Sequence, residues 1–358
     1  MNASKTSLIA LAATALSGTA FAQSSVTLFG LLDTGVSHYS VSGGQSKTVL
    51  SNHGNQLSRL GIRGTEDLGN GLRASFWLEA PLTVDDGTAA GLNFSRRSTI
   101  SLSGAWGELR AGRDFTPTYL NDGGFDPFNA TGVGTQVIVQ ARASNSAPGR
   151  AALTSGQGLN NALYLRSSNN ITYHLPDLGG IYGQAQYAFH EQASGGSKQG
   201  QYLGMRLGYK NQQLNVAVSA GKAYGTSSVA APDISTYSLG ASYNFKLATV
   251  MAHFGHDSID SGAASHRLNG FMLGTSVPVG KGQLKLAYSQ AKVNWEGSPK
   301  TRKLALGYVH DLSKRTQLYA TVAHMKNGGG ALLTVAPSMP GKANANSSGV
   351  DFGLVHRF

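Results

Sequence analysis

Hydrophobic and polar residues alternate along most of this chain. In residues 283–290, Leu284, Leu286 and Tyr288 share one parity, and Lys285 and Ser289 share the other. Residues 202–209, 237–245 and 350–358 repeat the pattern. Successive side chains of a β-strand point to opposite faces, so a period of two predicts strands with one apolar face. An amphipathic helix would separate residues i and i+2, and these segments exclude it.

The connections between the alternating segments come in two lengths. Short turns at 67–71, 176–180, 210–212 and 311–313 alternate with long connections at 41–56, 81–93, 223–235 and 327–348. Tight turns on one side and long loops on the other are typical of outer-membrane barrels. Counting the segments gives 16 strands, an even number that encloses a water-filled lumen. The predicted fold class is therefore all-β, a 16-stranded antiparallel transmembrane β-barrel.

Aromatic residues and composition agree with a membrane barrel. Several strands end in an aromatic residue on the apolar face, namely Tyr209, Tyr243, Phe245 and Phe358. Such residues form the girdles at the two membrane interfaces. The chain has no cysteine, which excludes disulfides and thiolate metal sites. No apolar stretch after residue 23 approaches the roughly 20 residues of a membrane helix.

The first residues have the pattern of an export signal. Lys5 precedes a short apolar run at 8–16, and Ala20-Phe21-Ala22 places small residues before a cleavage site. This pattern predicts a signal peptide over 1–22, cut before Gln23, and a single barrel domain over 23–358. A buried N-terminal helix is the less favoured alternative. The predicted location is the outer membrane of the cell, with many strands crossing it.

One connection is much longer than the others. About 50 residues without clear alternation separate a strand ending near Arg113 from one starting near Asn170. A loop of that length in a compact domain is usually functional. We therefore expect residues 114–168 to fold into the lumen as a third, constricting loop.

Parity along the strands predicts which charges face the lumen. Leu60 and Ile62 take the lipid side, so Arg59 and Arg63 face inward. Leu109 and Ala111 likewise take the lipid side, so Arg110 between them faces inward. In residues 94–102 strict parity sends Arg97 inward and Arg96 outward, and a bulge would exchange them. An arginine facing lipid at mid-depth costs about 2–4 kcal/mol, so whichever of the two lies deep must face the lumen.

Further charges belong to the long loop. Arg166 lies where the loop rejoins the wall, and Asp122 and Asp126 lie inside it, where they are expected to oppose the arginines across the pore. The chain has 29 basic and 18 acidic residues, which leaves a surplus of positive charge. A field of this sign at a constriction selects anions. The alternative is that single arginines merely pair with nearby acids.

Signals for other activities are weak. The net charge of +11 is spread along the chain, whereas nucleic-acid binders concentrate it, so no nucleic-acid partner is expected. His253 and His256 are three residues apart and point to opposite faces of a strand. Asp257 and Asp260 are interpreted as solvated loop residues. No HExxH, phosphate loop or G-x-S-x-G motif is present, so the prediction is no enzyme, metal or cofactor. A barrel protease or phospholipase, and an adhesin, remain as alternatives.

Several motifs resemble the general porins of β-proteobacteria, over the whole chain from residue 23. The matching segments are SVTLFG at 25–30, SRLGIRGTEDLG at 58–69, RRST at 96–99, LRAGRD at 109–114, LSKRTQLY at 312–319 and HRF at 356–358. Among these, the EDLG turn and the LSKRT segment are the most specific. Within the family the sequence is most similar to the anion-selective members.

This resemblance implies a homotrimer that lets small hydrophilic solutes, anionic and neutral, diffuse passively. It places constriction arginines at Arg59, Arg96 and Arg166, with Arg97 in reserve. It implies contact with outer-membrane lipid and lipopolysaccharide, and it suggests Phe358 as the signal for the barrel-assembly machinery. Many of these porins carry Pro-Glu-Phe-Gly in the inward loop, whereas this chain has Phe-Asp-Pro-Phe at 125–128. Asp126 is therefore the acid that matches the family's loop acid.

Overall fold

The computed structural model describes residues 25–87, 92–143, 164–191, 198–225, 232–260, 265–294, 296–336 and 338–358. The predicted signal peptide and its cut before Gln23 lie outside these residues. No helix within the described ranges is long and apolar enough to cross a membrane. The described chain is almost entirely antiparallel β-sheet.

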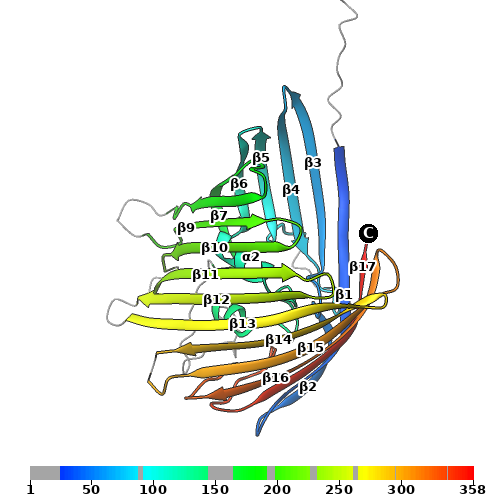
Figure 1. Ribbon diagram of the computed structural model, residues 1–358, viewed down its shortest axis with the longest axis vertical. Coiled ribbons are helices and arrows are strands. Elements are labelled where there is room, and N and C mark those ends of the chain that lie inside the picture. Colours follow the sequence, from blue (N-terminus) through cyan, green and yellow to red (C-terminus); the bar gives the residue numbers. More distant parts are fainter. Residues whose placement is uncertain are drawn as a thin grey trace, which may run out of the picture.

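Seventeen strands in the described residues form one sheet that closes into a barrel (Figure 1). Those in the first half are β1 (Ser25–Val41), β2 (Ser46–Asn52), β3 (Arg59–Gly69), β4 (Leu72–Pro81), β5 (Arg97–Gly104), β6 (Gly107–Phe115), β7 (Arg166–His174), β8 (Ile181–Ala188) and β9 (Tyr202–Lys210). Those in the second half are β10 (Leu214–Ala223), β11 (Asp233–Asn244), β12 (Thr249–Asp260), β13 (Ser265–Val279), β14 (Gly282–Val293), β15 (Lys300–Asp311), β16 (Thr316–Gly328) and β17 (Ser347–Arg357).

Strands β2 and β3 share one position in the wall. Residues 34–40 of β1 pair with β2, and residues 25–31 of β1 pair with β3. The barrel therefore has 16 strand positions, which confirms the predicted fold. The predicted long connection over 41–56 is wrong where β2 lies, because the apolar alternation of β2 is short and its neighbours are glycine and serine.

The first and last strands close the barrel. Strands β1 and β17 pair over 11 residues, from Leu31 with Arg357 to Val41 with Ser347. Beyond this register the Phe358 N–H donates to the Gly30 carbonyl oxygen at 3.0 Å, and the Gly30 N–H donates to the Phe358 carbonyl oxygen at 3.1 Å. Every described strand except β2, which pairs with β1 alone, has a partner on both sides, so the sheet closes through β1.

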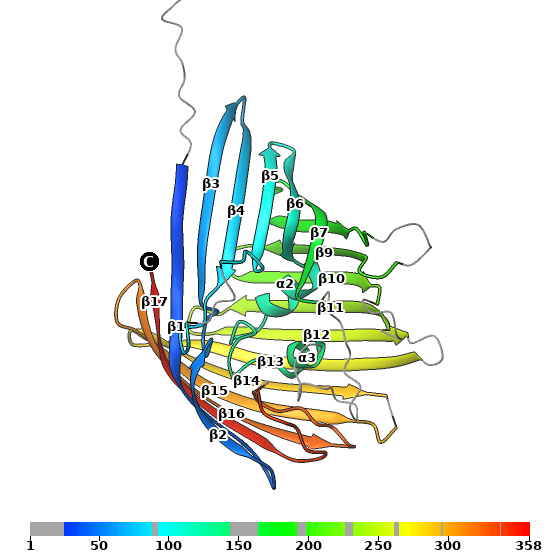
Figure 2. The ribbon, with the colours of Figure 1, turned by 180° about the vertical axis from the view of Figure 1, so that it is seen from behind.

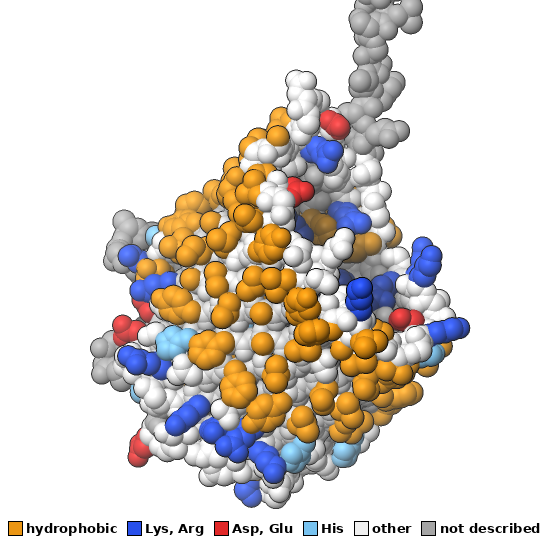
Figure 3. All heavy atoms as spheres, in the orientation of Figure 1, with side chains coloured by type: hydrophobic (Ala, Val, Ile, Leu, Met, Phe, Trp, Pro, Cys, Tyr) orange, Lys and Arg blue, Asp and Glu red, His pale blue; other side chains and the backbone are white. Residues whose placement is uncertain are grey.

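The two faces of the wall differ as the alternation predicts. On β15, Leu304 and Leu306 are 53 % and 45 % exposed on the outside, while Lys303 and Ala305, which alternate with them, are buried. The apolar side chains merge into a broad hydrophobic surface on the outside of the barrel (Figure 3). Transfer of this surface from water to lipid is what stabilises a barrel in a membrane.

The long connection after β6 enters the barrel. It carries two short helices, α2 (Pro117–Gly124) and α3 (Val137–Arg142), which Figure 2 shows on the concave side of the sheet. The Thr116 side chain caps α2 by accepting the Tyr119 N–H at 3.3 Å, and Pro117 follows the cap as the preorganised first residue. Helix α2 packs against β9–β11 and α3 against β13–β15. The described part of the connection, 116–143, is thus held inside the wall, and residues 144–163 lie outside the described chain.

Candidate functional site

Three arginines lie together where the inward loop leaves and rejoins the wall. Arg59 begins β3, Arg96 directly precedes β5, and Arg166 begins β7. The Arg96 Nε lies 2.6 Å from Glu79 Oε1, and the Arg59 Nε lies 3.8 Å from Glu79 Oε2. The Arg166 Nε donates to the Arg96 carbonyl oxygen at 2.7 Å. The three side chains therefore form one group, in which a single carboxylate faces three guanidinium groups.

Both members of the arginine doublet lie on the lumen side. Arg97 follows the inward parity of β5, because Ile100 and Leu102 are exposed on the outside. Arg96 lies before the first residue of β5, so strand parity does not apply to it, and its backbone and side chain both bond to Glu79. The predicted strand begins at residue 94, three residues before β5, and this early start caused the apparent conflict between the two arginines.

A second group of basic residues continues along β3–β6. Arg63 lies 5.0 Å and Arg97 lies 4.3 Å from the centre of the Trp77 ring, so the indole separates two guanidinium groups. Arg97 also lies 3.4 Å from Asp114, and Arg110 bonds to Asp114 at 2.8 Å. Attraction between an aromatic face and a cation stabilises such stacks without neutralising their charge.

Carboxylates neutralise only part of this wall. Four of the six predicted arginines pair with an acid, namely Arg59, Arg96, Arg97 and Arg110 with Glu79, Glu108 and Asp114. Arg63 and Arg166 take part in none of the ion pairs recorded for the described residues. Arg166 instead lies 4.1 Å from the centre of the Phe115 ring. The wall from β3 to β7 therefore keeps a net positive charge.

Asp122 and Asp126 do not face these arginines. Both carboxylates are buried within the inward loop, so the structure differs from the expectation that they oppose the arginines across open water. Asp126 accepts the N–H groups of Phe128 at 2.9 Å and Gln136 at 3.0 Å, and it closes a tight bend after α2. Asp126 therefore stabilises the loop itself, because its carboxylate turns back toward backbone donors.

A buried charge network fastens the inward loop to the opposite wall. Arg142 at the end of α3 bonds to Asp122 at 2.5 Å and to Asp257 of β12 at 2.9 Å. Asp122 also bonds to His253 Nε2 at 2.8 Å and accepts the Tyr164 hydroxyl at 2.6 Å. Burial alone would raise the pKa of Asp122, but Arg142 and His253 beside it lower the pKa below its usual range. The network links both helices and the returning chain to one strand.

One residue of this network differs from its predicted role, and a second agrees with it. Asp257 was interpreted as a solvated loop residue, but it lies within β12 and is fully buried. Its inward parity with His253 was the signal that went unused, because a third polar residue, Asp260, suggested a loop. His253 and His256 do point to opposite faces, as expected: His253 bonds to Asp122, and His256 is bonded to Asn269. No group of residues suited to a metal ion occurs in the described ranges.

The pH dependence of stability tests this network. Because the pKa of Asp122 is lowered in the folded protein, its contribution to stability is fully present above about pH 4 and is lost as the pH falls below that value. We expect the difference in urea midpoint between wild type and Asp122→Asn to narrow from pH 7 to pH 3. Burial raises the pKa of Asp126. The difference in urea midpoint between wild type and Asp126→Asn should therefore shift in favour of wild type as the pH falls from 7 to 3. Urea midpoints that change with pH in the same way in both variants would contradict this assignment.

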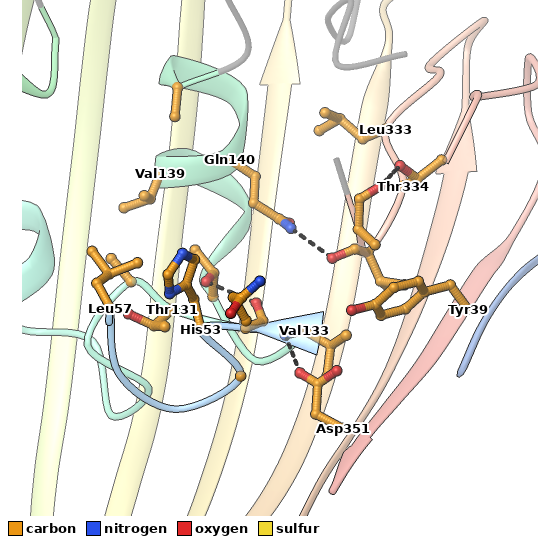
Figure 4. Close-up of a pocket in the computed structure, with 18 residues that line it drawn as sticks. Tyr39, His53, Leu57, Thr131, Val133, Val139, Gln140, Leu333, Thr334 and Asp351 are labelled. Carbon is orange, nitrogen blue, oxygen red and sulfur yellow. Dashed lines mark hydrogen bonds between the residues drawn. The ribbon is translucent and has the colours of Figure 1, made fainter. Parts of the chain in front are cut away.

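The connection between β16 and β17 also packs inside the barrel. Its buried residues Leu333, Val335 and Met339 join the same hydrophobic cluster as Val137 and Ile138 of α3. The Gln140 side chain donates to the Val335 carbonyl oxygen at 3.2 Å. Between this connection, the inward loop and β1 lies a cavity of about 250 Å³ (Figure 4).

The lining of this cavity combines apolar and polar side chains and is almost uncharged. It includes the hydroxyl of Thr131, the imidazole of His53 and the amide of Gln140 (Figure 4). Its one carboxylate, Asp351, already accepts the Val133 N–H at 2.9 Å and the Ser37 hydroxyl at 2.7 Å. The cavity is therefore a hydrogen-bonding recess beside the lumen, and the charged groups lie on the β3–β7 wall.

Three residues of the site were not predicted from the sequence: Glu79 and Trp77 in the arginine wall, and Arg142, which anchors the inward loop. Glu79 and Trp77 share the inward parity of β4, so the period of two could have placed them beside Arg59 and Arg63. Arg142 lies in the segment without alternation, and no sequence pattern pointed to its role. Its partner Asp257 is 115 residues away along the chain.

Comparisons with known proteins agree on one family. The model of the Gram-negative porin family matches residues 7–330. The chain is 40 % identical to outer membrane porin protein 32 of Delftia acidovorans, over 99 % of this chain and 100 % of that protein. It is 30 % identical to an outer membrane porin protein of Bordetella pertussis, again over 99 % and 100 %.

Solved structures give the same result. The anion-selective porin from Comamonas acidovorans superposes with a TM-score of 0.83 at 37 % identity, and the match covers 94 % of this chain and 100 % of that one. OmpT of Vibrio cholerae superposes with a TM-score of 0.66 at 14 % identity, over 94 % and 98 % of the two chains. At that identity the second likeness concerns the fold alone.

Proposed function

Because this chain belongs to the Gram-negative porin family, we propose that the arginines on the β3–β7 wall give its channel a preference for anions. The protein is an outer-membrane β-barrel that forms a water-filled channel for passive diffusion of small hydrophilic solutes. The observation that carries the proposal is the charge balance at the loop, where Glu79 alone faces Arg59, Arg96 and Arg166. Positive charge in a narrow, low-dielectric passage concentrates anions and repels cations.

The proposed selectivity residues have different roles. Arg166 is the strongest candidate, since it forms no ion pair among the described residues and packs on the Phe115 ring. Arg59 and Arg96 share Glu79, and Arg63, Arg97 and Arg110 extend the positive wall along the strands. Asp122 and Asp126 act as anchors of the loop, and they leave the arginine field without an opposing acid.

The partners and processing follow from the same family. The channel is a homotrimer in a membrane of lipid and lipopolysaccharide, and small anionic and neutral solutes cross it. Residues 1–22 are removed on export, and Phe358, whose backbone closes the barrel against Gly30, is the residue that the assembly machinery reads. A heat-modifiable trimer band in SDS gels of the purified protein tests the oligomer.

Enzyme and adhesin functions have less support. The family consists of channels. His253 is bonded to Asp122, but both are fully buried and the carboxylate is shared with Arg142. Activity screens with peptide and phospholipid substrates are expected to give no turnover.

Removing the shared acid is expected to strengthen the anion preference. In Glu79→Gln the Arg59 and Arg96 guanidinium groups lose their carboxylate, and the positive field in the lumen grows. We expect the chloride-to-potassium permeability ratio to rise by about two- to tenfold, the effect of about 0.4–1.4 kcal/mol. Zero-current potentials in planar bilayers under a KCl gradient measure this ratio.

Glu66→Gln is the matched control for this prediction. It removes the same charge from the neighbouring strand, but Glu66 shares the outward parity of Leu60 and Ile62 and lies near the short-turn end of β3, away from the loop. It is expected to leave the permeability ratio within the error of the wild-type value. A lower ratio in Glu79→Gln than in wild type would contradict the assigned role of the arginine group.

A further inference from the structure

Arg63 and two aromatic side chains form a corner on the lumen face of the wall. Phe29 of β1 and Trp77 of β4 meet edge to face, with their ring centres 5.2 Å apart. The guanidinium carbon of Arg63, on β3 between them, lies 5.3 Å from the centre of the Phe29 ring and 5.0 Å from that of Trp77. Strands β1, β3 and β4 are neighbours in the wall (Figure 1), and we call these three residues the aromatic corner.

The aromatic corner lies directly beyond Arg59, toward the short-turn end of the wall. Arg59, Gly61 and Arg63 are successive inward positions on β3, which runs on to the turn after Gly69. The Phe29 ring covers Gly61, because a Cβ there would lie 2.2 Å from the ring. A solute that passes Arg59 therefore meets the Phe29 ring and then Arg63.

The guanidinium group of Arg63 is held by the rings, but its hydrogen-bond donors are free. Its side chain is exposed to the lumen, and it donates none of the hydrogen bonds recorded for the described residues. Arg59, by contrast, donates to the Leu57 carbonyl oxygen, and Arg97 donates to the Thr99 hydroxyl. Contact with aromatic rings uses the faces of a guanidinium group, whereas its five N–H donors lie in its plane. Arg63 is thus an oriented fork without an acceptor in the described chain.

The inward positions beside the aromatic corner are neutral. In the register of the sheet, Arg63 pairs with Trp77, and Trp77 pairs with Thr99 on β5. The next inward row toward the short turns contains Thr65 and Ser75, whose hydroxyl oxygens lie 3.1 Å apart. These positions supply no carboxylate to Arg63, so its counter-ion comes from the lumen.

We propose that the aromatic corner is a second binding site in the channel, and that it takes monocyclic aromatic carboxylates of the benzoate type. The inference rests on the proposed function, because the group of Arg59, Arg96 and Arg166 first draws the anion into the constriction. Arginine pairs with a carboxylate through two parallel N–H···O bonds that lie in the plane of the guanidinium group. The channel therefore favours one class of solute among anions of the same charge.

The aromatic ring distinguishes this ligand from other anions. In benzoate the ring is conjugated with the carboxylate, so the whole anion lies in the plane of the guanidinium group that binds it. Its ring then lies against Phe29 and Trp77, and contacts between rings add to the ion pair. Chloride gains from the charge of Arg63 alone. Cyclohexanecarboxylate, which has the same charge and nearly the same size, gains the ion pair without the stacking.

The test uses the full-length channel in planar bilayers and compares two acids of the same charge. Benzoate or cyclohexanecarboxylate is added to a chloride solution, and the concentration that halves the chloride current is measured for each. One test variant is Phe29→Leu with Trp77→Leu, which keeps apolar side chains without rings, and the other is Arg63→Gln. The matched control variant is Trp106→Leu, which removes an exposed tryptophan at the β5–β6 turn. Benzamide, which is planar and uncharged, is the third probe.

We expect benzoate to halve the current at a concentration about three- to tenfold lower than cyclohexanecarboxylate, in wild type and in Trp106→Leu alike. The variant without the two rings should bring the two concentrations together, and Arg63→Gln should raise both. Equal concentrations for the two acids in wild type, a comparison that needs no variant to fold, would overturn the proposal. Block by benzamide at the concentration of benzoate would overturn it as well.

The zero-current potential of the wild-type channel separates this inference from the proposed function. A potential with the sign set by chloride, together with equal block by the two acids, would overturn the inference alone. An unchanged preference for benzoate in the variant without Phe29 and Trp77 would also overturn it, because the rings would then not be its cause.

Discussion

Replacing Arg142 by leucine is expected to lower the free energy of unfolding by about 3–5 kcal/mol, the largest stability loss among the substitutions considered for this protein. Arg142 is fully buried, and its guanidinium group bonds to Asp122 and Asp257. Its removal leaves two carboxylates in a dry environment without their cation. Urea midpoints of the protein in detergent micelles measure the loss.

The same substitution is expected to disturb the channel. Asp122 connects α2 to Arg142 and His253, so the inward loop loses its attachment to β12 when the arginine is absent. Single-channel recordings in planar bilayers should show frequent transitions between conductance levels, because the loop then has several positions in the lumen. Wild-type channels are expected to stay at one level under the same voltage.

Two comparisons isolate the buried charge. Arg267→Leu makes the same substitution at an exposed arginine of β13 and is expected to change stability by less than about 0.5 kcal/mol. Asp122→Asn and Asp257→Asn added to Arg142→Leu should recover part of the loss, because the uncompensated charges disappear. A midpoint for Arg142→Leu equal to that of Arg267→Leu would show that the network does not hold the loop.

The second large effect concerns selectivity. Changing Arg59, Arg96 and Arg166 to glutamine together is expected to lower the chloride-to-potassium permeability ratio by about tenfold or more. The three groups lie in one chain of contacts, and a cleft lined by charge of one sign changes local ion concentration by about 10–10³-fold. After the change Glu79 remains as an unneutralised acid, which adds to the shift toward cations.

The control for this triple variant removes the same charge elsewhere. Lys246→Gln, Lys281→Gln and Lys314→Gln together lie in turns at the opposite end of the strands, away from the inward loop. They are expected to leave the permeability ratio near the wild-type value at physiological salt, where charges farther than about 8 Å are largely screened. An equal fall in both triple variants would mean that total charge, and not this group of arginines, sets the preference.

Most of the wall was predictable from the sequence. Alternation depends on neighbouring residues only, and it identified strands such as β11 and β14 together with the inward parity of Arg63 and Arg110. It failed where the pattern was short or interrupted. Strand β2 was missed because it is brief, and β5 was extended too far because serine and arginine fit either a strand or a loop.

The anchoring of the inward loop was not predictable in the same way. The contacts that fix it join residues far apart along the chain, such as Arg142 with Asp257 and Gln140 with Val335. No local periodicity encodes a pairing between a loop and a distant strand. The length of the segment without alternation predicted that the loop enters the lumen, but it did not predict how the loop is attached. For this reason Asp122 and Asp126 were expected to face water, whereas burial and bonding place them inside the loop.

The zero-current potential of the wild-type channel in a planar bilayer under a KCl gradient tests the central claim most directly. The arginine wall predicts a conducting channel whose potential has the sign set by chloride, and a smaller potential as the salt concentration rises and screens the lumen charges. A potential with the sign set by potassium would contradict the anion preference, and the absence of conductance would contradict the channel itself.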